Sequence, residues 1–230
     1  MSFSRYIVHN DVNNPMISSF NAFDKVLGTY DPDLLVVSGL QMMDNYPFRE
    51  GNFSSSIFMI IQNKIISLHL RNFTDKRKNL LMNVKRQMLD RPSSTRIHFE
   101  MASFAEDKLL FELCDLVVPF ADSLGMNEQE IANLYNTMYY GNISLVANST
   151  PRVATVLDQM RTLFKLIRLR GKSITNSREL TRIHVHTLAY QAIFTVKDSI
   201  WKNTMAAAAK ASLTAHRHVC ASSNVSIIYI

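Results

Sequence analysis

Residues 33–39, Asp-Leu-Leu-Val-Val-Ser-Gly, form a continuous apolar run that ends in two small residues. Runs of this kind are typical of strands that are buried on both faces of a parallel sheet. Residues 95–100, Thr-Arg-Ile-His-Phe-Glu, and residues 181–187, Thr-Arg-Ile-His-Val-His-Thr, are two further predicted strands. Helical patterns separate these runs. The sequence therefore predicts βαβ units and an α/β fold.

The flanking helices are predicted from apolar residues at helical spacing. A further strand is expected at residues 5–9, and a short strand is expected directly after residue 118. In open α/β sheets ligands bind at the carboxyl ends of the strands, so a site is expected where each predicted strand ends. The expected helices cover residues 14–27, 78–89, 107–118, 127–140, 155–169 and 201–220.

The composition fits one domain with a hydrophobic core. The chain has 230 residues, of which 47% are hydrophobic and 19% charged. Two cysteines exclude a disulfide framework and a cysteine-rich zinc module. No apolar run approaches the roughly 20 residues of a membrane span, so none is expected. The net charge of 25 − 19 = +6 permits phosphate-bearing partners. Nucleic-acid binding is not expected, because no recognisable module or set of interleaved aromatic residues accompanies the basic residues.

Two short motifs carry side chains that suit phosphate or metal chemistry. His98 and Glu100 lie on one side of a predicted strand, at its end. Asn127 and Glu130 have the spacing of a helix N-cap and its capping box. A capped helix alone explains the second pair. A helix N-terminus also attracts phosphate, and two nearby carboxylates can hold Mg²⁺ through water. Spacing alone leaves both interpretations open.

Two histidines, His184 and His186, lie on one face of the predicted strand at residues 181–187. A zinc site needs a third and a fourth ligand, which no spacing supplies, so a hydrogen-bonding histidine near a ligand cleft is the preferred interpretation. The sequence contains no Walker A motif, no Gly-x-Gly-x-x-Gly and no Gly-x-Ser-x-Gly. Cys114 lies in an apolar helical pattern and is expected in the core.

Four stretches in one order resemble the ADP-dependent glucokinase family, its animal branch more than its archaeal one. The resemblance implies a ribokinase-like (Rossmann-like) fold, with a parallel or mixed sheet, flanking helices and a smaller lid domain. It also implies transfer of the β-phosphoryl of ADP to the 6-hydroxyl of glucose, which gives glucose 6-phosphate and AMP. ADP and glucose are thus the implied partners, and Mg²⁺ the implied cofactor. The four stretches are residues 38–43, 97–103, 123–130 and 181–188.

The resemblance also implies roles for individual residues. Glu100 of the His-x-Glu motif and Glu130 of the Asn-x-x-Glu motif are implied as metal-site residues. Asn127 is implied to lie near the ADP phosphates, and His186 and Thr187 to contact the nucleotide. This is coherent chemically, because phosphoryl transfer depends mainly on positioning and on charge neutralisation by a metal.

The chain departs from the family in ways that limit the expected activity. None of its six glycines begins the Gly-x-Gly-Asp motif that carries the family's catalytic aspartate, so no catalytic residue is assigned. Residues 1–230 are expected to be the central part of the kinase, an incomplete large domain that is inactive alone. Residues 52–75 lack the expected helical pattern and are predicted to be an insertion. The alternative is a catalytically dead ribokinase-like fragment that binds nucleotide or a partner protein.

Compartment and assembly are only weakly indicated. The triplet Asn-x-Ser/Thr occurs five times, which fits the secretory pathway or the endoplasmic reticulum lumen implied by the animal branch. A cytoplasmic location is the alternative, and a monomer is expected. The triplets begin at Asn52, Asn72, Asn142, Asn148 and Asn224.

Overall fold

A computed structural model of the chain describes residues 19–44, 77–104, 106–143, 148 and 150–220. The strand expected at residues 5–9 and the insertion expected at residues 52–75 lie outside these described residues.

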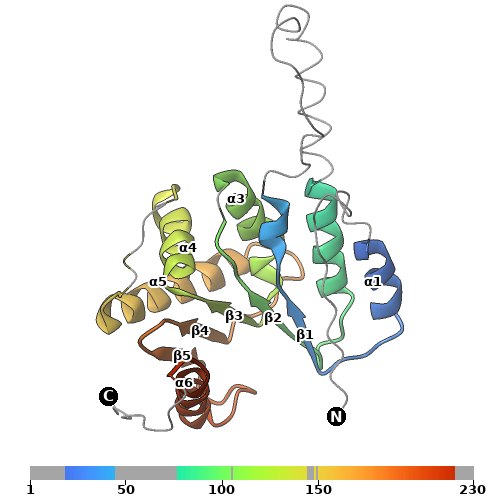
Figure 1. Ribbon diagram of the computed structural model, residues 1–230. Coiled ribbons are helices and arrows are strands. Elements are labelled where there is room, and N and C mark those ends of the chain that lie inside the picture. Colours follow the sequence, from blue (N-terminus) through green and yellow to red (C-terminus); the bar gives the residue numbers. More distant parts are fainter. Residues whose placement is uncertain (1–18, 45–76, 105, 144–147, 149, 221–230) are drawn as a thin grey trace, which may run out of the picture.

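The centre of the fold is a five-stranded sheet with the strands in sequence order (Figure 1). Neighbouring strands are parallel from β1 to β4, and β5 returns antiparallel to β4. This mixed sheet with flanking helices confirms the predicted α/β fold class. The strands are β1 (Leu34–Val37), β2 (Arg96–Glu100), β3 (Ser123–Met126), β4 (Arg182–His186) and β5 (Gln191–Thr195).

Helices follow most strands, as the apolar spacing predicts. None of those in the described residues has the length and apolarity needed to cross a bilayer. An unlabelled helix covers residues 77–89. The others are α1 (Ser19–Leu27), α3 (Asp107–Leu116), α4 (Glu128–Tyr140), α5 (Val153–Gly171) and α6 (Thr204–Cys220), with short 3-10 turns η1 (Leu40–Met43) and η2 (Val118–Phe120).

Two of the predicted elements differ from expectation for a local reason. The strand expected after residue 118 is wrong, because Pro119 lies in the 3-10 turn η2 there, and the next strand, β3, begins only at Ser123. The helix expected from residue 201 begins at Thr204, since Asn203 has a left-handed φ of 56°. Gly39, with φ 80°, turns the chain from β1 into η1, a conformation that favours glycine.

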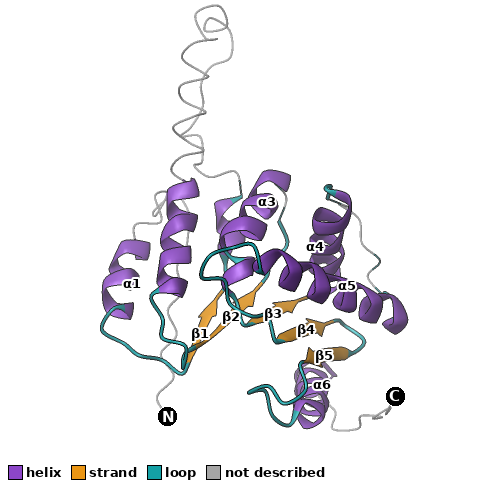
Figure 2. Ribbon diagram, turned by 180° about the vertical axis from the view of Figure 1, so that it is seen from behind, coloured by secondary structure: helices purple, strands orange, loops and turns teal. Residues whose placement is uncertain are grey.

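The two faces of the sheet differ in chemistry. Ile97, Phe99, Leu124 and Ile183 point to one face and are fully buried. Helix α5 covers that face, since it lies behind the sheet in Figure 1 and in front of it in Figure 2. Side chains alternate along a strand, so the opposite face receives the polar residues of β2, β3 and β4. The candidate site is therefore built on the polar face.

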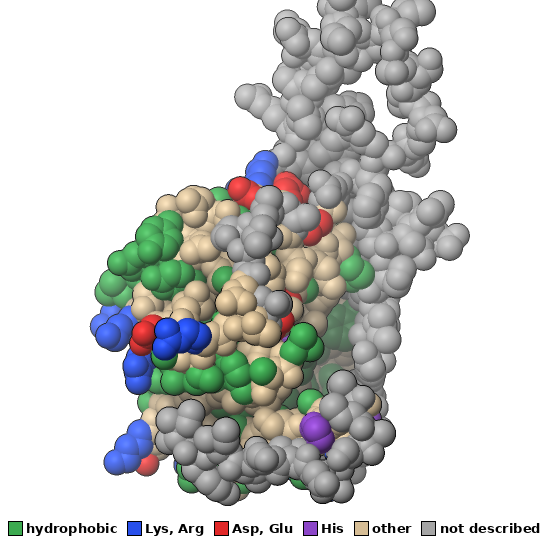
Figure 3. Space-filling model, turned by 60° about the vertical axis from the view of Figure 1, so that its left-hand side comes forward, with side chains coloured by type: hydrophobic (Ala, Val, Ile, Leu, Met, Phe, Trp, Pro, Cys, Tyr) green, Lys and Arg blue, Asp and Glu red, His purple; other side chains and the backbone are tan. Residues whose placement is uncertain are grey.

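Three tyrosines pack against one another at the C-terminal end of α4. The rings of Tyr135 and Tyr139 stack with centroids 5.4 Å apart, and Tyr140 meets both of them edge-on. Tyr139 and Tyr140 are more than half exposed. Figure 3 brings forward the side of the molecule that carries α4 and α5, and hydrophobic side chains gather there beside basic ones. Mutual stacking shields part of each ring from water and so stabilises the end of α4.

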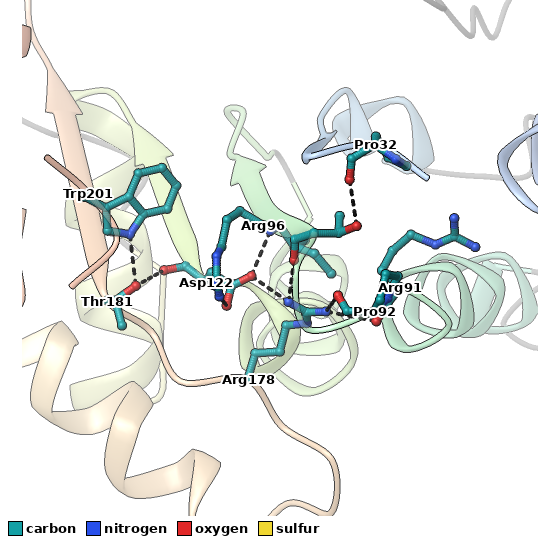
Figure 4. Close-up of polar contacts among 10 residues, drawn as sticks. Pro32, Arg91, Pro92, Arg96, Asp122, Arg178, Thr181 and Trp201 are labelled. Carbon is teal, nitrogen blue, oxygen red and sulfur yellow. Dashed lines mark hydrogen bonds and ion pairs between the residues drawn. The ribbon is translucent and has the colours of Figure 1, made fainter. Parts of the chain in front are cut away.

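An ion pair between Arg178 and Asp122 joins the strands at the amino edge of the sheet (Figure 4). The Arg178 guanidinium donates to Asp122 Oδ2 at 2.8 Å and to the carbonyl of Thr95 at 2.9 Å. It also donates to the carbonyls of Arg91 and Pro92, both at 3.1 Å. One side chain thus binds the segments that lead into β2 and β3.

Asp122 completes the connection through its backbone and its carboxylate. Its Oδ2 accepts from the Ile97 amide at 2.8 Å, and its own amide donates to the Ile97 carbonyl. Its carbonyl accepts from the Thr181 amide. The resulting register aligns His98 with Ser123 and Glu100 with Gly125, and Gly125 in turn with His184.

We expect Asp122→Ala to lower the free energy of unfolding by about 2–4 kcal/mol, because it leaves the partly buried Arg178 guanidinium without its counter-ion and the buried Ile97 amide without its acceptor. Urea denaturation measures the change. The control is Asp158→Ala, which breaks an exposed ion pair with Arg161. That variant should change stability by no more than about 1 kcal/mol. Equal losses in the two variants would show that the Asp122 pair is dispensable.

Candidate functional site

The polar residues that end β2, begin α4 and end β4 meet at the carboxyl edge of the sheet. Glu100 is the last residue of β2 and His186 the last of β4, while Asn127 joins β3 to α4. His186 donates from Nε2 to Glu100 Oε1 at 2.8 Å. The structure therefore brings together residues that lie 86 positions apart in the sequence.

Glu100 is held between two histidines. His98 Nε2 lies 2.9 Å from Glu100 Oε2, so each carboxylate oxygen faces an imidazole nitrogen. Burial opposes ionisation of Glu100, but the hydrogen bonds from His186 and His98 outweigh it and hold the pKa at about 2. The same pairing raises the pKa of His186. Glu100 is consequently a fixed, ionised carboxylate near neutral pH.

The Ser123 hydroxyl orients the His98 imidazole. Its hydroxyl lies 2.9 Å from His98 Nδ1, and its side chain is fully buried in β3. In the neutral tautomer that donates from Nε2 to Glu100, Nδ1 accepts the hydroxyl proton of Ser123. A chain of hydrogen bonds thus runs from Ser123 through His98 and Glu100 to His186.

Gly125 supplies the space that the Glu100 carboxylate occupies. A Cβ atom at Gly125 would lie 1.9 Å from Glu100 Oε2 and 2.9 Å from His98 Nε2. Glycine is therefore required for close approach rather than for backbone conformation. The sequence reasoning assigned no role to Gly125. The signal for it lay in the alternation Ser-Leu-Gly-Met of residues 123–126, which puts two small residues on one face of a strand.

The pair Asn127 and Glu130 forms the predicted capping box at the start of α4. Asn127 Oδ1 accepts from the amides of Gln129 and Glu130, each at 2.9 Å. The Glu130 carboxylate accepts from the amide and from Nδ2 of Asn127, both at 2.8 Å. Glu130 is 5% exposed, and burial raises its pKa. Its pKa also responds to the charges of His186, Glu100 and Glu128, so the capping box lies within electrostatic range of the same site.

Thr187 and His184 border this cluster and have other partners. The Thr187 hydroxyl accepts from the amides of Ala189 and Tyr190 and donates to the Tyr190 carbonyl, so it shapes the turn between β4 and β5. His184 Nε2 lies 2.8 Å from Gln191 Oε1. Burial lowers the pKa of His184. The nucleotide contact predicted for Thr187 stays a prediction.

The donor set suits Mg²⁺ better than a directly coordinated transition metal. Among the described residues no three His, Cys, Asp or Glu side chains are placed to hold a metal ion by themselves. Glu100 and Glu130 offer hard carboxylate oxygens at one place. Mg²⁺ in proteins commonly keeps several waters and uses one or two carboxylates together with substrate phosphates. The two glutamates therefore fit a hydrated Mg²⁺ that arrives with a phosphate ligand.

A carboxylate cluster beside a helix N-terminus, at the carboxyl edge of a parallel sheet, defines a class of phosphate-handling α/β proteins. Residues 2–74 and 65–229 match the family described as "ADP-specific Phosphofructokinase/Glucokinase conserved region". The chain belongs to this family of kinases.

Two animal proteins are similar along nearly the whole chain. ADP-dependent glucokinase of Bos taurus is 32% identical over 224 residues, which is 96% of this chain and 39% of that protein. Probable ADP-dependent glucokinase of Caenorhabditis elegans is 25% identical over 228 residues, again 39% of that protein. The chain thus spans about two fifths of the length of these relatives.

Solved structures of ADP-dependent kinases are more distant. The last common ancestor of ADP-dependent phosphofructokinases from Methanosarcinales gives a TM-score of 0.48 at 19% identity, and the match covers 80% of this chain and 31% of that one. An ADP-dependent kinase in complex with fructose-6-phosphate and ADPbetaS gives a TM-score of 0.47 at 19% identity. That match covers 78% of this chain and 32% of the other.

We expect Gly125→Ala to lower the free energy of unfolding by about 1–3 kcal/mol, because the added methyl group displaces Glu100 from His98. Denaturant unfolding and a crystal structure of the variant measure both effects. Shortening the displaced side chain in Gly125→Ala/Glu100→Asp should recover part of the loss. The control is Gly28→Ala, whose Cβ would lie 3.5 Å from the Lys25 carbonyl, an ordinary contact. If both glycine variants lose equally, the close approach at Gly125 is not the cause.

The Glu100–His186 pair gives stability a defined pH dependence. Glu100 has a lowered pKa, so its contribution is present above its ordinary pKa of 4.5 and is lost as the pH falls toward 2. His186 has a raised pKa, so its contribution is full below 6.5 and is lost as the pH rises through the raised value.

Imidazole titration followed by NMR tests this pairing. In the unmodified chain His186 should titrate above 6.5, and Glu100→Gln should move its pKa downward because the partner charge is gone. The same Glu→Gln change at Glu179, which pairs with Arg168 away from the site, should leave it unmoved. An unchanged His186 titration in Glu100→Gln would contradict the pairing.

Proposed function

We propose that the chain binds ADP and Mg²⁺ as the nucleotide-binding part of an ADP-dependent glucokinase. In the proposed reaction the β-phosphoryl of ADP passes to the 6-hydroxyl of glucose, giving glucose 6-phosphate and AMP. Glucose is favoured as acceptor because the animal relatives are named glucokinases. A monomer is the proposed assembly.

The observation that supports this proposal is the meeting of Glu100, His186 and the start of α4 at one edge of the sheet. The amide groups of a helix N-terminus attract phosphate, and the carboxylates beside it suit Mg²⁺. The Asn127 side chain is engaged in the cap, so its proposed contribution is to hold the amides of the first turn in place. The hydrogen bond to Glu100 raises the pKa of His186, which favours its cationic form beside the proposed phosphates.

Each proposed role in phosphoryl transfer is one of positioning. Bound Mg²⁺ would neutralise charge on the transferred phosphoryl oxygens and align them with the acceptor. Glu100, fixed by His98 and seated over Gly125, would hold water of the metal's hydration shell. Glu130 would do the same from the helix start while it keeps α4 capped.

No residue of this sequence is proposed as the general base. A sugar hydroxyl must lose its proton during transfer, and in kinases a positioned aspartate accepts it. The Gly-x-Gly-Asp motif is missing from the 230 residues, and general-base assistance contributes about 10²–10⁴-fold in rate. We therefore propose that this chain alone binds MgADP without appreciable phosphorylation of glucose. Residues 52–75 are proposed as an insertion that this role does not require.

Calorimetric titration of the purified chain with ADP, in Mg²⁺ and in EDTA, tests the binding role. ADP should bind more tightly with Mg²⁺, and Glu130→Gln or Glu100→Gln should weaken MgADP binding by about 10-fold or more while ADP binding in EDTA changes less. Glu179→Gln is the matched control and should bind like the unmodified chain. Failure of the unmodified chain to bind ADP in either condition would overturn the proposal.

A coupled assay for glucose 6-phosphate separates the two candidate functions. A chain that binds MgADP but gives no product fits the nucleotide-binding part of a kinase, and adding a family polypeptide that carries Gly-x-Gly-Asp should then restore turnover. If no turnover returns, the alternative of a catalytically dead nucleotide-binding fragment is favoured. Turnover by the chain alone would mean that another residue acts as the base.

A further inference from the structure

A hollow lies beside the edge strand β5, away from the carboxyl edge of the sheet. It has a volume of about 200 Å³ and opens between β4, β5 and the start of α6. Arg182, the first residue of β4, lines it, whereas His186 ends the same strand. At about 3.3 Å per residue these two Cα atoms lie roughly 13 Å apart. The lining residues are Arg182, Ile193, Thr195, Trp201, Lys202, Thr204 and Ala207.

Arg182 forms no ion pair within 4.0 Å in the part of the chain that the structure describes, and Glu100 attracts it only at longer range. Its closest polar contact there is Ser123 Oγ, 3.5 Å from Nη1, at the limit of a hydrogen bond. Burial lowers the pKa of its guanidinium, which shows that the group is withdrawn from water. Seven other described arginines do lie within 4.0 Å of an acidic side chain: Arg77, Arg86, Arg96, Arg161, Arg168, Arg170 and Arg178.

Trp201 fixes the guanidinium in place and forms an apolar wall. The Arg182 guanidinium carbon lies 4.9 Å from the centre of the indole ring. The indole Nε1 donates to Thr181 Oγ1 at 2.9 Å, a bond visible in Figure 4, and this hydroxyl donates to the Asp122 carbonyl. The wall is thus anchored to the network at the amino edge. Ile193 and Ala207 add further apolar surface.

The surroundings of the hollow are positively charged. Lys202 is a second cation in the lining, and no residue of the lining is acidic. The first turn of α6, which begins at the hollow with Thr204, carries no acidic side chain to offset the positive end of the helix dipole. The hydroxyls of Thr195 and Thr204 lie 3.2 Å apart and offer hydrogen bonds at the rim.

From this combination we propose that the hollow binds a small carboxylate on a flat apolar body. The two carboxylate oxygens match the fork of the Arg182 guanidinium, and Lys202 adds a second positive charge. The apolar body lies against Trp201 and Ile193. This site is separate from the proposed MgADP site and does not depend on it.

Trp201 is the only tryptophan of the chain, so its fluorescence reports on the hollow directly. Titration with benzoate should change the emission saturably, with a dissociation constant on the order of 1 mM. Benzamide has the same shape without the charge and should bind about 10-fold more weakly or not at all. Inorganic phosphate tests the charge without the apolar body and should also bind more weakly. Equal responses to benzoate and benzamide, or no response to benzoate, would overturn the proposal.

Variants and a competition experiment complete the test. Lys202 is exposed, so Lys202→Ala should keep the fold while weakening benzoate binding by about 3- to 10-fold. Arg182→Lys, which keeps the charge but loses the fork, should weaken it at least as much. The control is Lys165→Ala, an equally exposed lysine on α5.

Saturating MgADP should leave the benzoate titration unchanged. If MgADP displaces benzoate, the anion occupies the nucleotide site and the separate site is wrong. If Lys202→Ala and Lys165→Ala bind benzoate with equal affinity, Lys202 has no part in binding and the assigned hollow is wrong.

Discussion

The ion pair between Arg178 and Asp122 fixes the register of the central parallel strands. Its guanidinium binds the segment before β2, and its carboxylate partner bonds to the first buried residue of that strand, Ile97. Parallel strands have no tight turn between them that would fix their register. A buried ionic contact at the amino edge supplies that constraint here. Everything at the carboxyl edge then depends on an alignment made at the other end of the strands.

In this register, small side chains on β3 leave room for the polar residues of the site. Ser123 and Gly125 face His98 and Glu100 across the sheet, and both are small enough for the imidazole and the carboxylate to lie over them. A slip of one residue would present Leu124 instead and turn the polar side chains of β2 toward apolar neighbours. The polar face therefore exists only in the observed pairing. The short strand β3, which the sequence did not predict, therefore determines the polar face.

Much of this could be predicted from sequence where the signal is local. The apolar run of β1, the strand ending in His98 and Glu100, and the capping box at Asn127 each depend on neighbouring residues, and each element is confirmed. The burial of β1 on both faces was predicted wrongly, because Leu34 and Val36 lie on an edge strand and are about half exposed. The strand β3 was missed because four residues that include a glycine have little β-propensity, and their burial comes from tertiary packing. The antiparallel strand β5 was missed although Ile193, Phe194 and Thr195 favour strands, because its five residues show no clear alternation of polar and apolar side chains. The close approach of Glu100 to Gly125 is a contact between two strands, and the spacing of residues along the sequence does not predict such a contact.

The arrangement around Glu100 has a consequence for ion selectivity. Both carboxylate oxygens already face imidazole nitrogens, and the group is only partly exposed to water. A cation that approaches it must compete with hydrogen bonds that are already formed rather than with loosely held solvent. Small ions of high charge density gain enough electrostatic energy for this exchange, whereas K⁺ or Na⁺ gain far less from the same carboxylate. If Glu100 holds the proposed Mg²⁺, the two histidines would therefore favour divalent over monovalent ions at this site.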